Sequence, residues 1–192
     1  MGRTSTRTVA ELADTLVELV EAGYARRTGV SNWPADRLSS LAQHLAERGH
    51  TAVASYQFSL AEPDPARMNG NIHADAAVLR AVHDHRLPLV SWSSQARGFF
   101  ARPDAGQNDV RPDAFDTEQN RARRRRCREL AAELGSSPET VALAWTLRHP
   151  GVWPSIGPKT PRQLNRSLDA LHLSLTDEQA HWLRHGGERP AG

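Results

Sequence analysis

The spacing of apolar and polar positions along the chain predicts helices that alternate with short strands. The first helix is predicted over residues 8–22, because Thr8 and Glu11 have the spacing of a capping box and Gly23 follows its end. Its apolar face is predicted to consist of Leu12, Leu16, Leu19 and Val20.

Four strands are predicted, and each is separated from the next by at least one helix. The strands are residues 26–31, 51–57, 87–93 and 151–156. The remaining helices are predicted over 34–48, 75–85, from 117 onward, 138–147, 161–171 and 177–185. Right-handed crossovers make such strands parallel, so the predicted class is α/β.

The segment 94–116 is too long for a plain connection and is predicted to be a functional loop. The ends of the chain, residues 1–7 and 186–192, are expected to be disordered. No composition shift marks a boundary between them, so residues 8–185 are expected to form one domain.

The composition of the chain bears on its location and on whether it could hold a disulfide or a metal ion. The chain has 192 residues, of which 39% are hydrophobic, and a formal net charge of +2. It contains no apolar run near 18 residues and no leader of the signal-peptide kind, so a cytoplasmic protein without a membrane partner is expected. Cys127 is the only cysteine, which rules out an internal disulfide, and no histidine has metal-binding spacing, so no metal site is expected.

Arginines crowd residues 121–128, and two interpretations apply. The run could be a stripe that binds phosphates of a nucleic acid. A solvated helix face is favoured, because no aromatic residues are interleaved and Glu129 and Glu133 follow directly. Nucleic acid is therefore an unlikely partner. Lys159 is the only lysine in the chain.

Four motifs at the predicted strand ends resemble one family. In order and spacing, they resemble the carboxyl-terminal half of an aldo-keto reductase: residues 27–33 (RTGVSNW), 55–60 (SYQFSL), 90–100 (VSWSSQARGFF) and 156–164 (IGPKTPRQL). The family fold is an eight-stranded TIM barrel that binds a nicotinamide cofactor, usually NADPH, so the resemblance implies a partial barrel of about four parallel strands. No Gly-x-Gly-x-x-Gly follows any strand, which is consistent with a family that lacks a Rossmann domain.

The resemblance implies roles for individual residues. Ser31, Asn32 and Gln57 match the residues that hydrogen-bond the nicotinamide carboxamide, a task for which amide side chains supply donors and acceptors. Trp92 matches the aromatic residue stacked on the nicotinamide ring, although an ordinary core tryptophan is the alternative. The other matches are Ser93, Arg97 and Gly98 at the pyrophosphate, Gly157, Lys159, Thr160 and Gln163 at the adenosine 2′-phosphate, and Ser167 where the family frequently has an asparagine near the adenine.

The chain departs from the family in one motif and in its catalytic residues. Ser94 and Gln95 stand where the family often has Pro or Leu. In relatives a tyrosine donates the proton, tuned by a lysine, an aspartate and a histidine that lie on the first four strands. Here Tyr24 precedes the first strand, Tyr56 lies inside a strand, and the only lysine is matched to the cofactor phosphate, so no catalytic residue is predicted.

Two functions follow from this pattern. One is an NADPH-dependent reductase of aldehydes or ketones that keeps cofactor-binding residues and lacks the catalytic half, so that it is inactive alone. The alternative is a non-catalytic truncated or split barrel that acts as a binding or scaffold subunit. A four-stranded parallel sheet cut from a barrel exposes two edges, and a second chain that completes the barrel would cover them.

Overall fold

The computed structural model describes residues 7–102 and 113–190, which form two compact units. Unit 1 contains the residues up to Tyr56 together with Ala74–Val90, and unit 2 contains Gln57–His73 together with the residues from Ser91 onward. The expected functional loop 94–116 lies outside the described residues over 103–112, as do residues 1–6 and 191–192 of the expected disordered ends.

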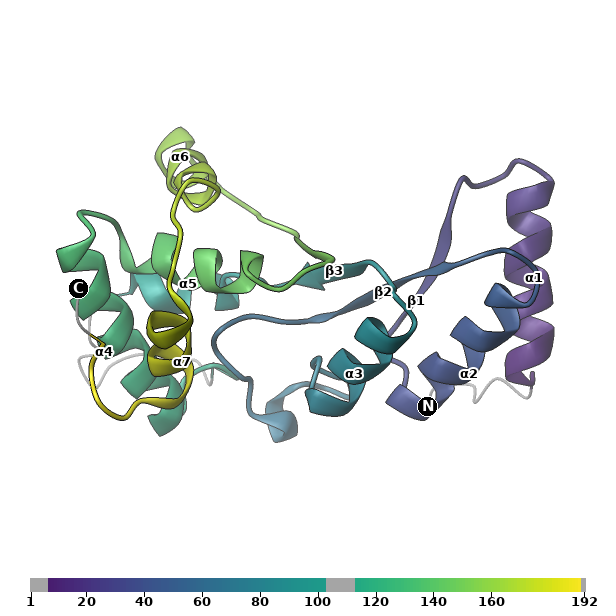
Figure 1. The fold of residues 1–192 in the computed structure, drawn as a ribbon, viewed down its shortest axis with the longest axis horizontal. Helices are drawn as coiled ribbons and strands as arrows, with labels where there is room; N and C mark the ends of the chain where they lie inside the picture. The colour runs from purple at the N-terminus through teal and green to yellow at the C-terminus, as the bar shows by residue number, and fades with distance from the viewer. Residues whose placement is uncertain (1–6, 103–112, 191–192) are drawn as a thin grey trace. The chain divides into compact units, whose positions relative to one another are not determined.

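Unit 1 is built from helices that lie side by side. Its elements are α1 (Val9–Glu21), β1 (Thr28–Ser31), α2 (Ala35–Ala46), most of β2 (Ala52–Gln57), α3 (Ala76–Asp84) and the start of β3 (Leu89–Trp92). Helix α1 packs against α2, and α2 packs against α3 (Figure 1). Every predicted element of this unit is present, with ends within about three residues of the prediction.

The buried face of α1 differs from the predicted one. The capping box of Thr8 and Glu11 is formed, with the Glu11 backbone N–H donating to Thr8 Oγ1 at 3.2 Å. However, Ala13 and Val17 are the buried residues, whereas Leu19 is 38% exposed. The small Ala13 side chain lets α1 approach the cluster of Leu41, Leu45 and Ala52, and this choice depends on the partner helix rather than on the size of the apolar residues.

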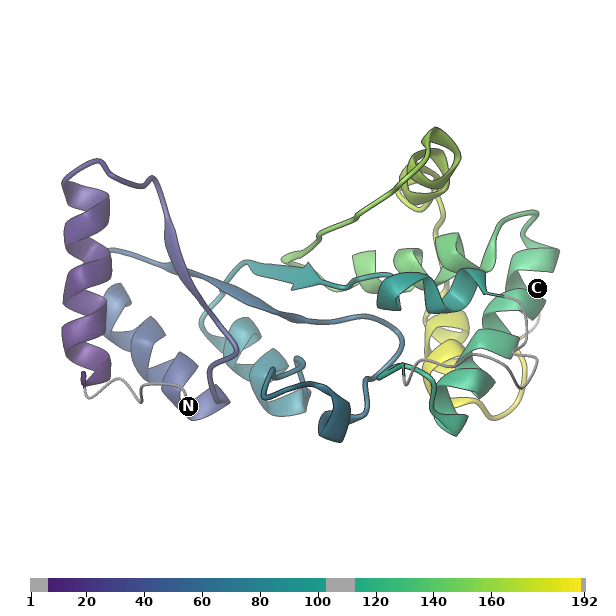
Figure 2. The same cartoon turned by 180° about the vertical axis from the view of Figure 1, so that it is seen from behind.

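Unit 2 contains the longest helix, α4, and three shorter ones. Its elements are a 3-10 turn at Pro65–Arg67, a second short helical segment at Ala96–Ala101, α4 (Glu118–Glu133), α5 (Pro138–Leu147), β4 (Val152–Pro154), α6 (Pro161–Asp169) and α7 (Asp177–His185). Helix α5 packs against α4 and α6, and α4 also packs against α7 (Figure 2). Side-chain caps predicted from the sequence begin α5 at Ser137 and α7 at Thr176.

The four strands form one parallel sheet in the order β1-β2-β3-β4, flanked by helices. In unit 1, Thr28 pairs with Ala52 and Ser31 with Ser55, and the Ala54 N–H donates to Pro88 O at 2.9 Å. In unit 2, the Ser155 N–H donates to Ser91 O at 2.8 Å, which joins β4 to β3. Gly29 is required in β1, because a Cβ there would lie 2.2 Å from Val53 O.

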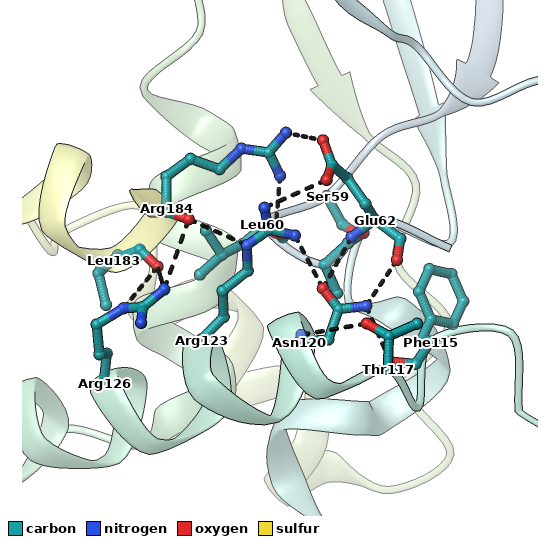
Figure 3. A network of polar contacts seen from close by, with 11 residues as sticks. Ser59, Leu60, Glu62, Phe115, Thr117, Asn120, Arg123, Arg126, Leu183 and Arg184 are labelled. Carbon is teal, nitrogen blue, oxygen red and sulfur yellow. Dashed lines mark hydrogen bonds and ion pairs between the residues drawn. The ribbon is translucent and has the colours of Figure 1, made fainter. Parts of the chain in front are cut away.

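The sequence predicted that the arginines of α4 form a solvated face, and this is true of Arg121 and Arg125 but wrong for Arg123 and Arg124. Arg123 is 1% exposed and Arg124 is 4% exposed. Arg123 Nε donates to Arg184 O at 3.1 Å, and Arg126 Nη2 donates to Leu183 O at 3.0 Å (Figure 3). The carbonyls at the end of α7 have no partner within their own helix, so cations from α4 bind them.

Arg123 also belongs to a polar cluster that we call the Glu62 network, made of the buried Asn120 and Arg123 and the half-buried Glu62 and Arg184 (Figure 3). Arg123 Nη2 lies 3.2 Å from Glu62 Oε2, and Arg184 pairs with Glu62 Oε1. The Asn120 amide bonds both backbone groups of Glu62, accepting from its N–H at 3.1 Å and donating to its O at 2.6 Å. The network therefore fixes the segment after β2 to α4 and α7.

Burial and charge oppose each other at Glu62. Burial by itself would raise the pKa of the Glu62 carboxyl, but the charges of Arg184 and Arg123 and their hydrogen bonds hold that pKa below its ordinary value. Burial lowers the pKa of Arg123, and the neighbouring charge of Arg184 lowers it further. The negative charge of the Glu62 carboxylate thus offsets the repulsion between the Arg123 and Arg184 guanidinium groups.

In the tail expected to be disordered, Arg189 contacts other residues of unit 2. The Arg189 guanidinium lies over the Trp182 ring, 5.8 Å from its centroid, and Arg189 also pairs with Glu133.

Candidate functional site

A pocket of about 750 Å³ lies within unit 2. Its walls come from the loop after β3, the residues after β4 and the first turns of α6. The residues that line it are Ser93, Ser94, Gln95, Arg97, Gly98, Ala101, Glu139, Ser155, Ile156, Gly157, Pro158, Lys159, Arg162, Gln163 and Arg166. We call it the α6 pocket.

The loop after β3 has an unusual backbone. Ser93, Ala96 and Arg97 have φ of 50°, 48° and 53°, a left-handed conformation that non-glycine residues adopt at an energetic cost, and Gly98 follows with φ of 81°. Surrounding contacts must therefore hold the loop. Ser94 Oγ donates to Ser155 O at 2.8 Å, which ties the loop to the end of β4.

Helix α6 starts at the rim of the pocket. Thr160 is its N-cap, and its hydroxyl accepts from the Gln163 N–H at 3.2 Å. Gln163 Oε1 in turn accepts from the Lys159 N–H at 2.7 Å, which fixes the backbone just before the helix. The N-terminal end of a helix carries partial positive charge and free N–H groups, so it favours an anion.

Cationic side chains dominate the charge of the pocket. Arg97, Lys159 and Arg162 line it and are exposed. Arg166 lines it as well but pairs with Glu139, a carboxylate whose side chain is 12% exposed. The pocket wall thus carries three exposed cations and a fourth, Arg166, whose charge Glu139 neutralises. The excess positive charge attracts a phosphate or carboxylate.

The structure brings together the residues that the resemblance assigned to the phosphates. Ser93, Arg97, Gly98, Gly157, Lys159 and Gln163 all line the α6 pocket. Thr160 adjoins it as the cap of α6, and Ser167 is 4% exposed behind it, within hydrogen-bond reach of Gln95. These positions lie in two segments, 93–98 and 157–167, which are separated by some sixty residues.

The residues assigned to the nicotinamide are not gathered in this pocket. Ser31 and Asn32 belong to unit 1, where Ser31 Oγ donates to Ser55 O at 2.8 Å and accepts from Asn32 Nδ2 at 3.1 Å. Gln57 belongs to unit 2 but is 1% exposed, and its Nε2 donates to Ser59 Oγ at 3.0 Å. Trp92 is half-buried at the end of β3 and does not line the α6 pocket.

Sequence reasoning missed several lining residues. Arg162 and Arg166 are four residues apart on α6, so helical spacing after Lys159 could have indicated them. Ser94 and Gln95 were noted only as departures from the family, yet both hold the loop to another wall of the pocket. Glu139 lies on α5, and no local signal connects it to the pocket.

Neither tyrosine has the surroundings of a proton donor. Tyr56 is completely buried, and its hydroxyl donates to Trp33 O at 2.7 Å. Burial raises the pKa of Tyr56, the hydrogen bond to Trp33 opposes that rise, and the charge of Asp75 adds to it, so the phenol is a weaker acid than usual. Tyr24 is 82% exposed. Among residues 7–102 and 113–190, no group of three His, Cys, Asp or Glu could hold a metal ion.

Comparison with known proteins decides the family. The sequence model of the Aldo/keto reductase family matches residues 3–185. The chain belongs to the aldo/keto reductase family.

Individual relatives extend this result. The chain is 27% identical to versiconal hemiacetal acetate reductase of Aspergillus parasiticus over 93% of its own length and 55% of the relative's. It is 30% identical to aldo-keto reductase ausK of Aspergillus calidoustus, covering 97% of this chain and 48% of that one. The chain therefore spans about half the length of the curated relatives it matches.

Solved structures show the same fold. A thermostable aldo-keto reductase crystallised with the inhibitor epalrestat superposes with a TM-score of 0.68 and 19% identity, covering 96% of this chain and 57% of that chain. The predicted α/β architecture with parallel strands and flanking helices is thus confirmed, and aldo-keto reductases of known structure share it. None of the helices in the described residues is long and apolar enough to cross a membrane.

Proposed function

We propose that this chain binds NADPH and forms the cofactor-binding part of an enzyme that reduces an aldehyde or ketone to an alcohol. The α6 pocket carries this proposal. Lys159 and Arg162 lie beside the start of α6, where the adenosine 2′-phosphate of NADPH would find two cations and a helix N-terminus. Arg97 and the loop 93–98 would bind the pyrophosphate.

The chemistry of these residues fits an anionic dinucleotide. Bound NADPH supplies the hydride, and Lys159, Arg162 and Arg97 neutralise its phosphates. Gly98, in the left-handed conformation with nothing within 4 Å of a Cβ position, leaves room for a phosphate against the backbone. For the nicotinamide we assign Ser31, Asn32, Gln57 and Trp92, as the resemblance implies.

The proton that completes the reduction needs an acid from outside these residues. The Tyr56 hydroxyl is bound to Trp33 O, and its raised pKa makes it a poor donor. Lys159, the only lysine, lines the α6 pocket. We therefore propose that this chain is inactive by itself and that the Tyr, Lys, Asp and His of the family come from another polypeptide segment.

A second chain that completes the barrel would supply that segment. Exposed leucines on α6 and just after it support this proposal, because Leu164 and Leu168 are one helical turn apart and 39% and 44% exposed, and Leu171, in the turn that follows, is 63% exposed. A complete barrel would cover the outer strand and this helix. Sedimentation of the purified chain tests the idea, and a monomer that unfolds cooperatively would contradict it.

A titration of the chain with NADPH, followed by quenching of tryptophan fluorescence, tests the proposed function. NADH is the matched ligand, because it differs only in the missing 2′-phosphate. We expect micromolar affinity for NADPH and weaker binding of NADH. Absence of binding to both would favour the alternative, a scaffold subunit that uses the barrel segment without a cofactor.

A further inference from the structure

Two histidines of α7 lie one helical turn apart. Of the nine histidines in the chain, His181 and His185 are the only two separated by three or four positions, the spacing that brings side chains of a helix together. Their ring centroids are 4.7 Å apart, and the ring planes are inclined by 35°. Both residues are exposed. The pair therefore presents two neighbouring imidazoles to the solvent.

The ring nitrogens of this pair are available to a ligand. Among residues 7–102 and 113–190, no hydrogen bond engages the ring of His181 or His185. The ring of His149, in contrast, lies 3.2 Å from Trp145 O through its Nδ1. A neutral imidazole has one nitrogen with a lone pair, so the pair offers two such donors from one helix.

The backbone that carries the pair is held by other helices of unit 2. Trp145 Nε1 donates to Ala180 O at 3.1 Å, directly before His181. Arg126 Nη2 donates to Leu183 O at 3.0 Å, between the two histidines (Figure 3). Because α7 is fixed in place, little backbone freedom is lost when both rings bind one ligand.

The end of α7 is also a favourable place for a cation. The C-terminal end of a helix carries partial negative charge, and α7 ends at His185. Arg184, the cation next to His185 in the chain, pairs with Glu62 Oε1. The Glu62 carboxylate thus compensates the charge of Arg184, which reduces the repulsion between Arg184 and a bound metal ion.

We propose that His181 and His185 chelate a divalent transition-metal ion that prefers imidazole, such as Ni²⁺ or Cu²⁺, with water at its other positions. Metal–nitrogen bonds of about 2.0–2.1 Å would place the two donor nitrogens about 3 Å apart. Rings with centroids 4.7 Å apart reach that separation by turning about their side-chain bonds. Two protein ligands suit such an open site rather than the closed four-ligand site of structural zinc.

This proposal departs from the sequence-based expectation of no metal site, and it does not depend on cofactor binding. A bound ion would join two successive turns of α7. It would thereby stabilise the helix whose end carbonyls accept from Arg123 and Arg126.

Equilibrium dialysis of the full chain, without an affinity tag, against Ni²⁺ tests the proposal at about pH 8, where imidazoles are neutral. We expect one Ni²⁺ per chain. His181→Ala and His185→Ala should each weaken binding about 100-fold, because a single imidazole lacks the advantage of chelation. His172→Ala, at an exposed histidine outside the pair, is the matched control and should keep the affinity.

Two further measurements separate chelation from loss of structure. Cu²⁺ should bind more tightly than Ni²⁺, and Mg²⁺, which prefers oxygen ligands, should not bind. Excess Ni²⁺ should raise the thermal unfolding midpoint of the unaltered chain and of His172→Ala, but not that of His181→Ala or His185→Ala. Without metal, all four chains should unfold at the same temperature, because the replaced side chains are exposed. His185→Gln, which keeps a polar side chain, repeats the test if His185→Ala does not fold.

Three results would overturn the proposal. The first is absence of Ni²⁺ and Cu²⁺ binding up to about 1 mM, the range of weak contacts. The second is binding that persists with unchanged affinity in His181→Ala and His185→Ala. The third is an equal loss of affinity in His172→Ala, because it would show that isolated surface histidines bind the ion.

Discussion

Unit 2 contains two groups of cationic side chains with opposite surroundings. In the Glu62 network, Arg123 is buried and bonded to a carboxylate, an amide and a helix-end carbonyl. Around the α6 pocket, Arg97, Lys159 and Arg162 are exposed and line an open space. The difference teaches that a cation has a structural role where the fold surrounds it with partners, whereas a cation exposed on a pocket wall stays accessible to a ligand.

We expect the largest effect, a loss of stability, from removing Arg123 from the Glu62 network. Arg123→Ala should lower the free energy of unfolding by about 3 kcal/mol, because it leaves the Glu62 carboxylate and the Asn120 amide with fewer partners in a buried place. Urea unfolding followed by circular dichroism measures it. Arg125→Ala, at an exposed arginine of the same helix, should change stability by less than about 0.5 kcal/mol. Equal losses in the two variants would contradict a special role for Arg123.

We expect the second largest effect, a loss of NADPH affinity, from removing a cation of the α6 pocket. Lys159→Ala should weaken NADPH binding about 10-fold, as expected for a charge-assisted contact, and should leave NADH binding nearly unchanged. Its unfolding midpoint should match that of the unaltered chain, since Lys159 is exposed. Fluorescence titration measures the affinities. An equal loss for NADPH and NADH would place Lys159 away from the 2′-phosphate.

The pH dependence of stability tests the role of Glu62 in the Glu62 network. The pKa of Glu62 is lower in the folded chain than its ordinary value of 4.5, so the unfolded chain binds the proton first as the pH falls. Its contribution to stability is therefore present above about pH 4.5 and is lost as the pH falls through the folded pKa. Unfolding midpoints between pH 7 and pH 3 should fall less steeply in Glu62→Gln, whereas Glu18→Gln, at an exposed position of α1, should follow the unaltered chain.

We expect the smallest effect from a change in salt concentration, which should act on NADPH affinity more than on stability. Raising NaCl from about 0.1 M to about 1 M shortens the Debye length from about 10 Å to about 3 Å. Exposed cations of the α6 pocket should lose affinity for NADPH several-fold, while the unfolding midpoint of unit 2, which contains the buried network, should change little. Isothermal titration at the two salt concentrations measures the first, and thermal unfolding measures the second. Salt-independent binding would argue against phosphate recognition.

Much of the fold was predictable because its signals are local. Thr8, Ser137 and Thr176 begin helices through hydrogen bonds to residues three positions away, and these caps are formed as predicted. The alternation of strands and helices is also read from short stretches of sequence, and it indicated parallel strands. The buried face of α1 was predicted only in part: Leu16 packs against the core, but the helix packed against α1 buries Ala13 and leaves Leu19 exposed.

By itself, the sequence determined the family and the segments matched to its cofactor, since motifs 27–33, 55–60, 90–100 and 156–164 are continuous stretches. The tertiary structure decided which side chains remain available. It buried Arg123 and Gln57, and it placed Gln95 against Ser167. The physical reason is range: a cap needs a partner within one helical turn, whereas the contacts that bury or orient these side chains join residues about sixty or seventy positions apart.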